Sequence, residues 1–221
     1  MRTRHLLVAA AIGAAALIPA TANAATLRVV TPAKTIFGAT ATSVGSARAY
    51  LDSKGKAHAL KANTALGQLV AAAGYTGTSI NAVYSAGMGA YVTKIDGVAA
   101  PKTGYWELFV NDLPAAVGAD ALVLRKSDRV LWIADSDYSA KNGPFVYDLT
   151  AQKNSDGTIT FTGWRVGGPK PVPAAGVMIS VTGLVGATLN AKGQTTLTLP
   201  EPWTASIGAR GTVIGSETLS G

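Results

Sequence analysis

The chain has no cysteine, and this absence excludes three kinds of chemistry. Disulfide bonds, thiolate metal sites and a cysteine nucleophile all need the missing thiol. Histidine is scarce as well, because the sequence has only His5 and His58. A serine nucleophile needs a base within reach, and the sequence has no G-x-S-x-G motif. We therefore expect a protein that is not an enzyme and whose stability comes from its apolar core.

Charged residues are sparse, at 14% of the chain. Lys and Arg outnumber Asp and Glu by 19 to 12, but they are scattered and form no run of five or more. A footprint for a polyanion normally needs such a cluster. We expect no nucleic-acid partner, and we interpret the basic residues as a solvated surface.

Long apolar runs are absent except at the start of the chain. Arg2 and Arg4 precede an apolar stretch at residues 6–18, and Ala22-Asn23-Ala24 supplies the small residues that a signal peptidase accepts. The stretch is shorter than the roughly 20 residues that cross a bilayer. We predict a signal peptide at residues 1–24, no transmembrane segment after its removal, and a secreted or extracellular protein, whose association with the cell surface stays open.

The next part of the chain has the pattern of a small sheet with one helix. Asn63 is the predicted helix cap and Gly74 the predicted end, and between them apolar side chains recur at helical spacing, at Leu66, Leu69, Val70 and Ala73. The predicted strands are a hairpin of Leu27–Val30 with Ala47–Leu51, then Tyr91–Ile95, Tyr105–Val110 and Val130–Ile133. A hairpin, a helix and three strands predict a β-grasp-like domain at residues 25–135.

Three segments of this domain carry a resemblance to a known family: 89–97, 104–111 and 124–132. They resemble the transcobalamin C-terminal-like domain, a DUF4430-like bacterial domain of unknown function related to the β-domain of cobalamin carriers. The resemblance implies the β-grasp fold and makes cobalamin the one ligand to consider, although no cofactor is expected. In the carriers a separate helical barrel closes the site, and we expect no such barrel here, so corrinoid binding is the alternative function.

His58 is the one candidate ligand for a cobalt ion outside the predicted signal peptide. It lies in a polar stretch before the predicted helix, where a solvated loop histidine is the commoner case. No metal site is expected, because the Asp/Ser/Asn-rich turns at 135–137 and 154–157 lack the glutamate at the twelfth position of a calcium loop.

Residues after 135 predict short strands separated by turns. An Asn154-Ser155-Asp156-Gly157 turn between apolar runs predicts a connector β-hairpin at residues 136–166. A Gly/Pro-rich spacer follows at 167–175, where we place a domain boundary. Residues 176–221 predict a small β-sandwich, and the segment 190–200 is similar to immunoglobulin-like repeats of bacterial surface proteins, with Leu197 and Leu199 facing inward. The chain as a whole is predicted to be mainly β.

Aromatic residues gather in or beside the predicted strands of the first domain. Strand side chains alternate between two faces, so these rings cannot all lie in one core. One interpretation packs Trp106 and Trp132 against the predicted helix and places Tyr91 and Tyr105 at the edge of the sheet. The other makes an open platform for a ligand from Tyr91, Tyr105, Trp106 and Asn111. We expect a secreted, non-enzymatic binding or display module whose extracellular ligand, a protein or a glycan, the sequence does not identify.

Overall fold

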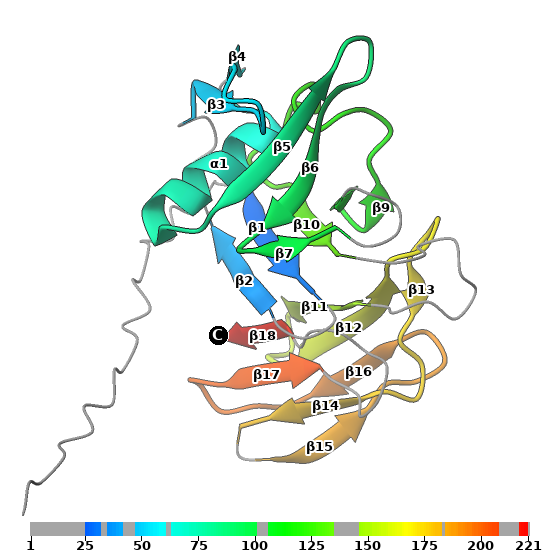
Figure 1. Ribbon diagram of the computed structural model, residues 1–221. Helices are drawn as coiled ribbons and strands as arrows, with labels where there is room; N and C mark the ends of the chain where they lie inside the picture. Colours follow the sequence, from blue (N-terminus) through cyan, green and yellow to red (C-terminus); the bar gives the residue numbers. More distant parts are fainter. Residues whose placement is uncertain are drawn as a thin grey trace, which may run out of the picture.

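The computed structural model describes residues 25–31, 35–41, 47–60, 63–100, 106–134, 146–182, 184–207 and 217–220. The predicted signal peptide at 1–24 lies outside them. The described chain is mainly β with one short helix, as predicted, and it forms an N-terminal unit (residues 25–134) and a C-terminal unit (residues 146–220), each with its own apolar core (Figure 1). No helix among these residues has the length and apolar character needed to cross a membrane.

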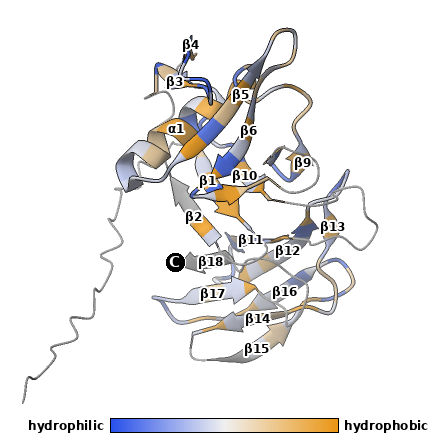
Figure 2. Ribbon diagram, in the orientation of Figure 1, coloured by the Kyte–Doolittle hydropathy of each residue, from blue (hydrophilic) through white to orange (hydrophobic). Residues whose placement is uncertain are grey.

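A mixed five-stranded sheet is the centre of the N-terminal unit. Its strand order is β2-β1-β10-β8-β9, with bounds Thr35–Ala41, Thr26–Val30, Arg129–Ile133, Glu107–Val110 and Leu113–Pro114. The first and last long strands, β1 and β10, pair in parallel although they lie about a hundred residues apart in sequence. The expectation that Val130–Ile133 is covered on both faces is confirmed, since all four side chains are buried. Figure 2 shows the hydrophobic colouring of β10 at the middle of the unit.

The helix α1, Ala65–Thr76, begins and ends at residues other than those predicted. Its cap is Thr64, whose hydroxyl accepts the Gly67 N–H at 3.1 Å, and its end is Gly77, which adopts a left-handed φ of 71°. The prediction of Asn63 and Gly74 is therefore wrong at both ends. Asn63 lies one residue before the observed cap. Gly74 lies within the helix, because the left-handed residue that ends the helix is Gly77, three residues later.

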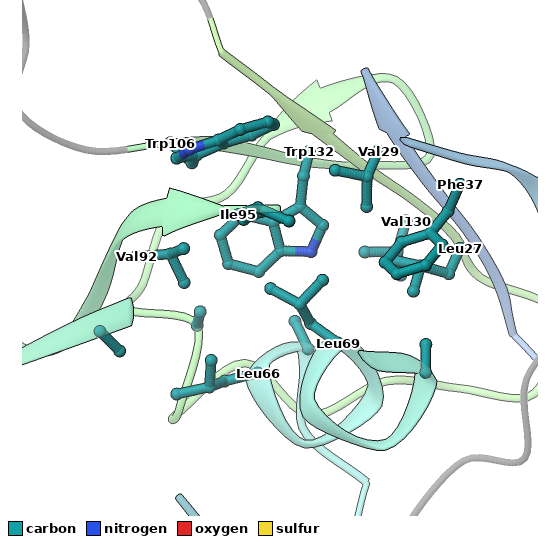
Figure 3. Packing of buried hydrophobic residues seen from close by; sticks show 14 of the residues in the cluster. Leu27, Val29, Phe37, Leu66, Leu69, Val92, Ile95, Trp106, Val130 and Trp132 are labelled. Atoms are coloured by element: carbon teal, nitrogen blue, oxygen red, sulfur yellow. The ribbon is translucent and has the colours of Figure 1, made fainter. Parts of the chain in front are cut away.

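The inner face of α1 packs on the five-stranded sheet. Leu66 and Leu69 are fully buried, and Leu69 lies beside the Trp132 ring of β10 (Figure 3). Leu27 and Val29 of β1 complete this contact from the neighbouring strand. Each such side chain contributes about 1.5–3 kcal/mol through burial. The helix is about three turns long and depends on this packing to persist in water.

Two smaller sheets flank α1. One is the hairpin β3 (Ala49–Leu51) with β4 (Ala57–Ala59), and the other contains β5 (Ile80–Ser85), β6 (Gly89–Ile95) and β7 (Val98–Ala99). The predicted hairpin of Leu27–Val30 with Ala47–Leu51 is wrong. The Asp52–Gly55 turn joins β3 to β4, whereas β1 pairs with β2 and β10. Adjacent apolar runs do not specify which strands pair.

The C-terminal unit consists of two four-stranded sheets with one shared core. In the first, β12 (Ile159–Val166) pairs with β11 (Val146–Lys153), β13 (Val172–Pro173) and β16 (Gln194–Leu197). The second has the order β15-β14-β17-β18, with bounds Leu184–Thr188, Met178–Val181, Thr204–Ile207 and Glu217–Ser220. The core takes side chains from both sheets, including Leu149, Phe161, Ile179 and Ile207.

The hairpin expected as a connector at 136–166 is built into this unit. Phe161 of β12 meets Trp203 edge-on at 5.3 Å between ring centroids, and β12 pairs with β16 over four residues. Leu197 and Leu199 are half-buried against the same core, as expected. The sequence also predicts a strand at 212–214, which lies outside the described residues, and it does not predict β18. The β-grasp and β-sandwich assignments, and the domain boundaries, stay predictions.

The two units meet through a third apolar cluster. It joins Val30, Phe109 and Ile133 of the N-terminal sheet to Val146 and Val166 of the C-terminal unit. Strand β8 serves both cores, because Leu108 and Val110 face the helix side while Phe109 faces the C-terminal unit. Beside this cluster the Arg28 Nη1 atom donates to the Tyr147 carbonyl at 2.6 Å.

Candidate functional site

A cleft of the N-terminal unit lies between β6, β8 and the segment that follows β9. At one end the strands touch, because the Trp106 N–H donates to the Val92 carbonyl at 2.8 Å. At the other side the Ala115 N–H donates to the Leu108 carbonyl at 2.8 Å and holds the segment after β9 against β8. Strands β6 and β8 belong to different sheets, and the cleft lies between them.

The cleft has a volume of about 650 Å³ and a mainly apolar lining. Trp106 and Trp132 form its buried part, and Phe109, whose side chain faces the C-terminal unit, also borders it. Met88 and Val117 stand at its rim with 71% and 51% of their surface exposed. Glu107, which is buried, is the one carboxylate among the described residues of the lining. We call this feature the β6–β8 cleft.

The structure separates the four residues of the predicted platform. Tyr91 and Trp106 both line the β6–β8 cleft, Tyr91 half-buried and Trp106 only 2% exposed. The Trp106 indole N–H donates to the Val98 carbonyl at 3.3 Å, so this ring is tied into the core. Tyr105 lies outside the described residues. Asn111 does not line the cleft.

Asn111 has a local structural role in the β8–β9 turn. It adopts a positive φ of 52°, which asparagine tolerates better than most residues. Its side chain donates to Asp128 Oδ1 at 2.9 Å and accepts the Arg129 N–H at 3.0 Å. These bonds fix the turn to the start of β10, on the side of the sheet that faces the C-terminal unit.

Sequence reasoning missed the rim of the cleft. Met88 lies in the β5–β6 turn, and Val117 lies in the loop after β9. Neither position belongs to a periodic apolar pattern. The only signal in the sequence for this rim was Gly87-Met88-Gly89, in which a large apolar side chain lies between two glycines typical of an exposed turn.

The structure corrects the interpretation of His58 as a solvated loop residue. His58 lies on β4 with only 13% of its side chain exposed, between the rings of Tyr50 and Tyr84 at centroid distances of 5.2 and 4.4 Å. Its Nε2 atom lies 2.9 Å from Asp52 Oδ2. The two rings and the carboxylate enclose the imidazole, which is unlike an open position for a cobalt ligand.

Electrostatics around this histidine follow from the same packing. The hydrogen bond from His58, followed by those from the backbone amides of Lys56 and Lys54, lowers the pKa of Asp52. Burial raises the pKa of Tyr50 to about 12, and the nearby carboxylates of Asp120 and Asp52 add to the rise. A tyrosine with this pKa stays neutral and is a poor nucleophile or base near neutral pH.

Metal-ligating side chains do not gather in the described part of the chain. No group of three or more His, Asp or Glu residues there has the geometry to hold an ion. In the turn at 154–157, the polar side chain of Asp156 stabilises the turn itself. Asp156 Oδ1 accepts the backbone N–H of Thr158 at 2.9 Å and the hydroxyl of Thr158 at 2.6 Å. The second suspected turn, at 135–137, lies outside the described residues.

One family comparison gives a result. The model of a domain of unknown function (DUF4430) matches residues 63–136, about a third of the chain. The matched segment runs from α1 to β10 and contains the whole lining of the β6–β8 cleft. No curated protein and no solved structure matches the chain. The predicted likeness to this domain of unknown function is confirmed, while the transcobalamin relation and the immunoglobulin-like segment stay predictions.

Proposed function

We propose that the protein is an exported, non-enzymatic binding or display module that takes a flat or amphipathic ligand into the β6–β8 cleft. The cleft is the observation that carries this proposal. Its volume of about 650 Å³ falls within the range of about 300–1,000 Å³ that is typical of small-molecule sites. Its aromatic lining offers a large contact area at a small cost in side-chain entropy.

The rim supports the same function. Single apolar residues on a protein surface need no explanation, but Met88 and Val117 continue an apolar lining outward into solvent. A ligand that fills the cleft would remove both side chains from water. This gain is about 25 cal/mol for each Å² of apolar surface covered.

The lining does not suggest catalysis. Enzymes that use both a general acid and a general base commonly place two titratable groups with separated pKa values near the reacting atoms. In the described lining, Glu107 is the single carboxylate, and His58 belongs to the separate stack with Tyr50 and Tyr84. We therefore propose binding without turnover.

The architecture we propose has a β-grasp head and an immunoglobulin-like β-sandwich as a stalk or partner-contact unit. The parallel pairing of β1 with β10, with α1 packed on the same sheet, supports the β-grasp assignment. The two four-stranded sheets with one shared core support the sandwich assignment. The physiological partner is then an extracellular ligand, protein or glycan.

Cobalamin is the first ligand to test, because the segments that resemble the cobalamin carriers lie within the matched residues 63–136 and line the cleft. We propose two calorimetric titrations of the purified chain, one with cobalamin and one with the flat amphipathic dye anilinonaphthalene sulfonate. Met88→Glu and Val117→Glu place a charge at the rim that also repels the sulfonate of the dye. Met178→Glu, at a side chain 56% exposed on the C-terminal unit, is the matched control.

Binding that weakens about tenfold or more in both rim variants, a loss of about 1.4 kcal/mol, and stays unchanged in the control supports a ligand site in the cleft. Cobalamin binding with this pattern would make corrinoid binding the function. Equal affinity in all four proteins, or no heat with either probe, would contradict the proposal.

A further inference from the structure

A charged cluster, buried except at Arg129, lies beside the apolar contact between the two units. Its members are Arg28 on β1, Asp112 in the β8–β9 turn, Arg129 at the start of β10 and Asp148 on β11. The first three belong to the N-terminal unit and Asp148 to the C-terminal unit. We call these four residues the joint cluster.

The joint cluster connects the units through both of its arginines. The Arg129 Nη2 atom lies 2.5 Å from Asp112 Oδ2 and 3.0 Å from Asp148 Oδ2, so one guanidinium pairs with carboxylates of both units. Arg28, only 5% exposed, donates to the carbonyl of Tyr147, the neighbour of Asp148. The contact is polar, buried and continuous with the apolar cluster of Val30, Phe109 and Val146.

The two carboxyl groups are also close to each other, because both Oδ2 atoms contact the same Arg129 nitrogen. Two like charges this close in a buried site disfavour the ionisation of both groups, so one carboxyl group keeps a proton more readily than a free one. The side chains of Asp112 and Asp148 are 11% and 9% exposed, so water screens them little. Burial and the Asp148 carboxyl together raise the pKa of Asp112 to about 7, although Arg129 and Arg28 act in the opposite direction.

We propose that the Asp112–Asp148 contact is a proton-dependent latch, which holds the two units together more tightly in mildly acidic than in neutral or alkaline medium. The charged groups that face Asp112 are Arg28 from β1, Arg129 from β10 and Asp148 from β11. One guanidinium pairs with both carboxyls, and loss of the proton leaves two adjacent negative charges at the joint.

The direction of the effect follows from proton linkage. In separated units Asp112 loses Asp148 and burial but keeps Arg129 of its own unit, so its pKa is no higher than the ordinary value of 3.8. Docking therefore takes up a proton when the pH lies between 3.8 and about 7. The stability that this proton gives is fully present below the lower value and is lost as the pH rises toward the higher one. The docking equilibrium constant falls by up to about tenfold per pH unit in this window.

The absence of cysteine makes the test direct. Tyr75→Cys on α1 and Met178→Cys on β14 replace side chains that are 68% and 56% exposed, one in each unit. Spin labels at these two positions report the distance between the units. We expect a narrow distance distribution at about pH 5 that broadens by about pH 8.

Asp112→Asn imitates the protonated carboxyl, and asparagine fits the left-handed φ of 68° at this position. This variant is expected to keep the narrow distribution at both pH values. Asp156→Asn, in an exposed turn of the C-terminal unit, is the control and is expected to behave like the parent chain. An unchanged distribution in the parent, or equal broadening in parent and Asp112→Asn, would overturn the latch.

Urea unfolding of the unlabelled chains provides a second measurement. The parent is expected to lose more stability than Asp112→Asn between about pH 5 and about pH 8. Equal losses in the two proteins would overturn the proposal even if the labelled variants fold poorly.

Discussion

His58 stacks on Tyr84 at 4.4 Å between ring centroids, and this contact links two hairpins that share no strand pairing. His58 belongs to β4 and Tyr84 to β5. A backbone bond from the Ser53 N–H to the Ala82 carbonyl, 2.8 Å long, joins the same hairpins. The histidine is therefore a structural clasp at the edge of the N-terminal unit.

Replacing His58 by Ala removes two ring contacts and the hydrogen bond to Asp52. We expect a loss of about 1.5–4.5 kcal/mol in the free energy of unfolding, since each of the two ring contacts and the hydrogen bond contributes about 0.5–1.5 kcal/mol. Urea unfolding measures this loss. Lys56→Ala, an exposed change in the same hairpin, is expected to stay within about 0.5 kcal/mol of the parent, and equal effects of the two changes would argue against the clasp.

The stability that the contact between His58 and Asp52 contributes is expected to depend on pH. Because the folded pKa of Asp52 is lowered, the ionised form contributes stability above the ordinary pKa of 3.8, and this contribution is lost as the pH falls through the lower folded value. Asp52→Asn cannot titrate. We expect its melting temperature to fall less than that of the parent between about pH 5 and about pH 2. Parallel melting curves over this range would contradict the assignment.

The cap of α1 tests a correction of the sequence prediction. Thr64→Ala removes the hydroxyl that accepts the Gly67 N–H, and we expect a loss of about 0.5–2 kcal/mol. Asn63→Ala leaves the cap intact. The hydrogen bond at Asn63 is made by its backbone carbonyl, which accepts the Leu124 N–H, and the substitution keeps this carbonyl. Chemical denaturation of both variants distinguishes the two residues. A larger loss for Asn63→Ala would restore the original prediction.

The local elements of this protein were predictable, and their partners were not. The strand at Val130–Ile133 and the turn at 154–157 were predictable because the residue types within each segment favour that local structure. The pairing of β1 with β10 depends on contacts across about a hundred residues, and no local pattern contains this information. The same limit applied to the site. Tyr91 and Trp106 were identified as aromatic strand residues, whereas the rim of the cleft comes from loops.

Asn111 and His58 show the other source of error. Each is a polar residue in a turn or polar stretch, for which the sequence offered either a ligand-binding or a solvated role. The structure assigns both to packing and hydrogen bonds within the fold. Buried polar contacts of this kind depend on neighbours from other elements, such as Asp128 and Tyr84, and so cannot be inferred from spacing.

Gly193 is held at a position that no other residue suits. It has a φ of 72°, and a Cβ atom there would lie 2.5 Å from the Gly163 carbonyl oxygen of the adjacent strand. We expect Gly193→Ala to cost more than the roughly 1–3 kcal/mol of a left-handed non-glycine residue alone. Gly157→Ala is the control, since its φ is 83° but no atom lies within 4 Å of its Cβ position. Thermal unfolding of the two variants should separate backbone strain from steric overlap, and equal melting temperatures would contradict the close approach.

Trp106 and Tyr91 line the same cleft, but they differ in burial. Truncation of Trp106 is therefore expected to lower mainly the stability of the fold, and truncation of Tyr91 mainly the binding of a ligand. Trp106 is 2% exposed and hydrogen-bonded to the Val98 carbonyl, so Trp106→Ala is expected to cost about 3–5 kcal/mol of unfolding free energy. Tyr91 is half-buried, so Tyr91→Ala should cost about 1 kcal/mol and should weaken dye binding in the titration proposed above. If Tyr91→Ala left dye binding unchanged, Tyr91 would be a structural residue of β6, and the ligand contacts of the cleft would have to come from Met88 and Val117 at its rim.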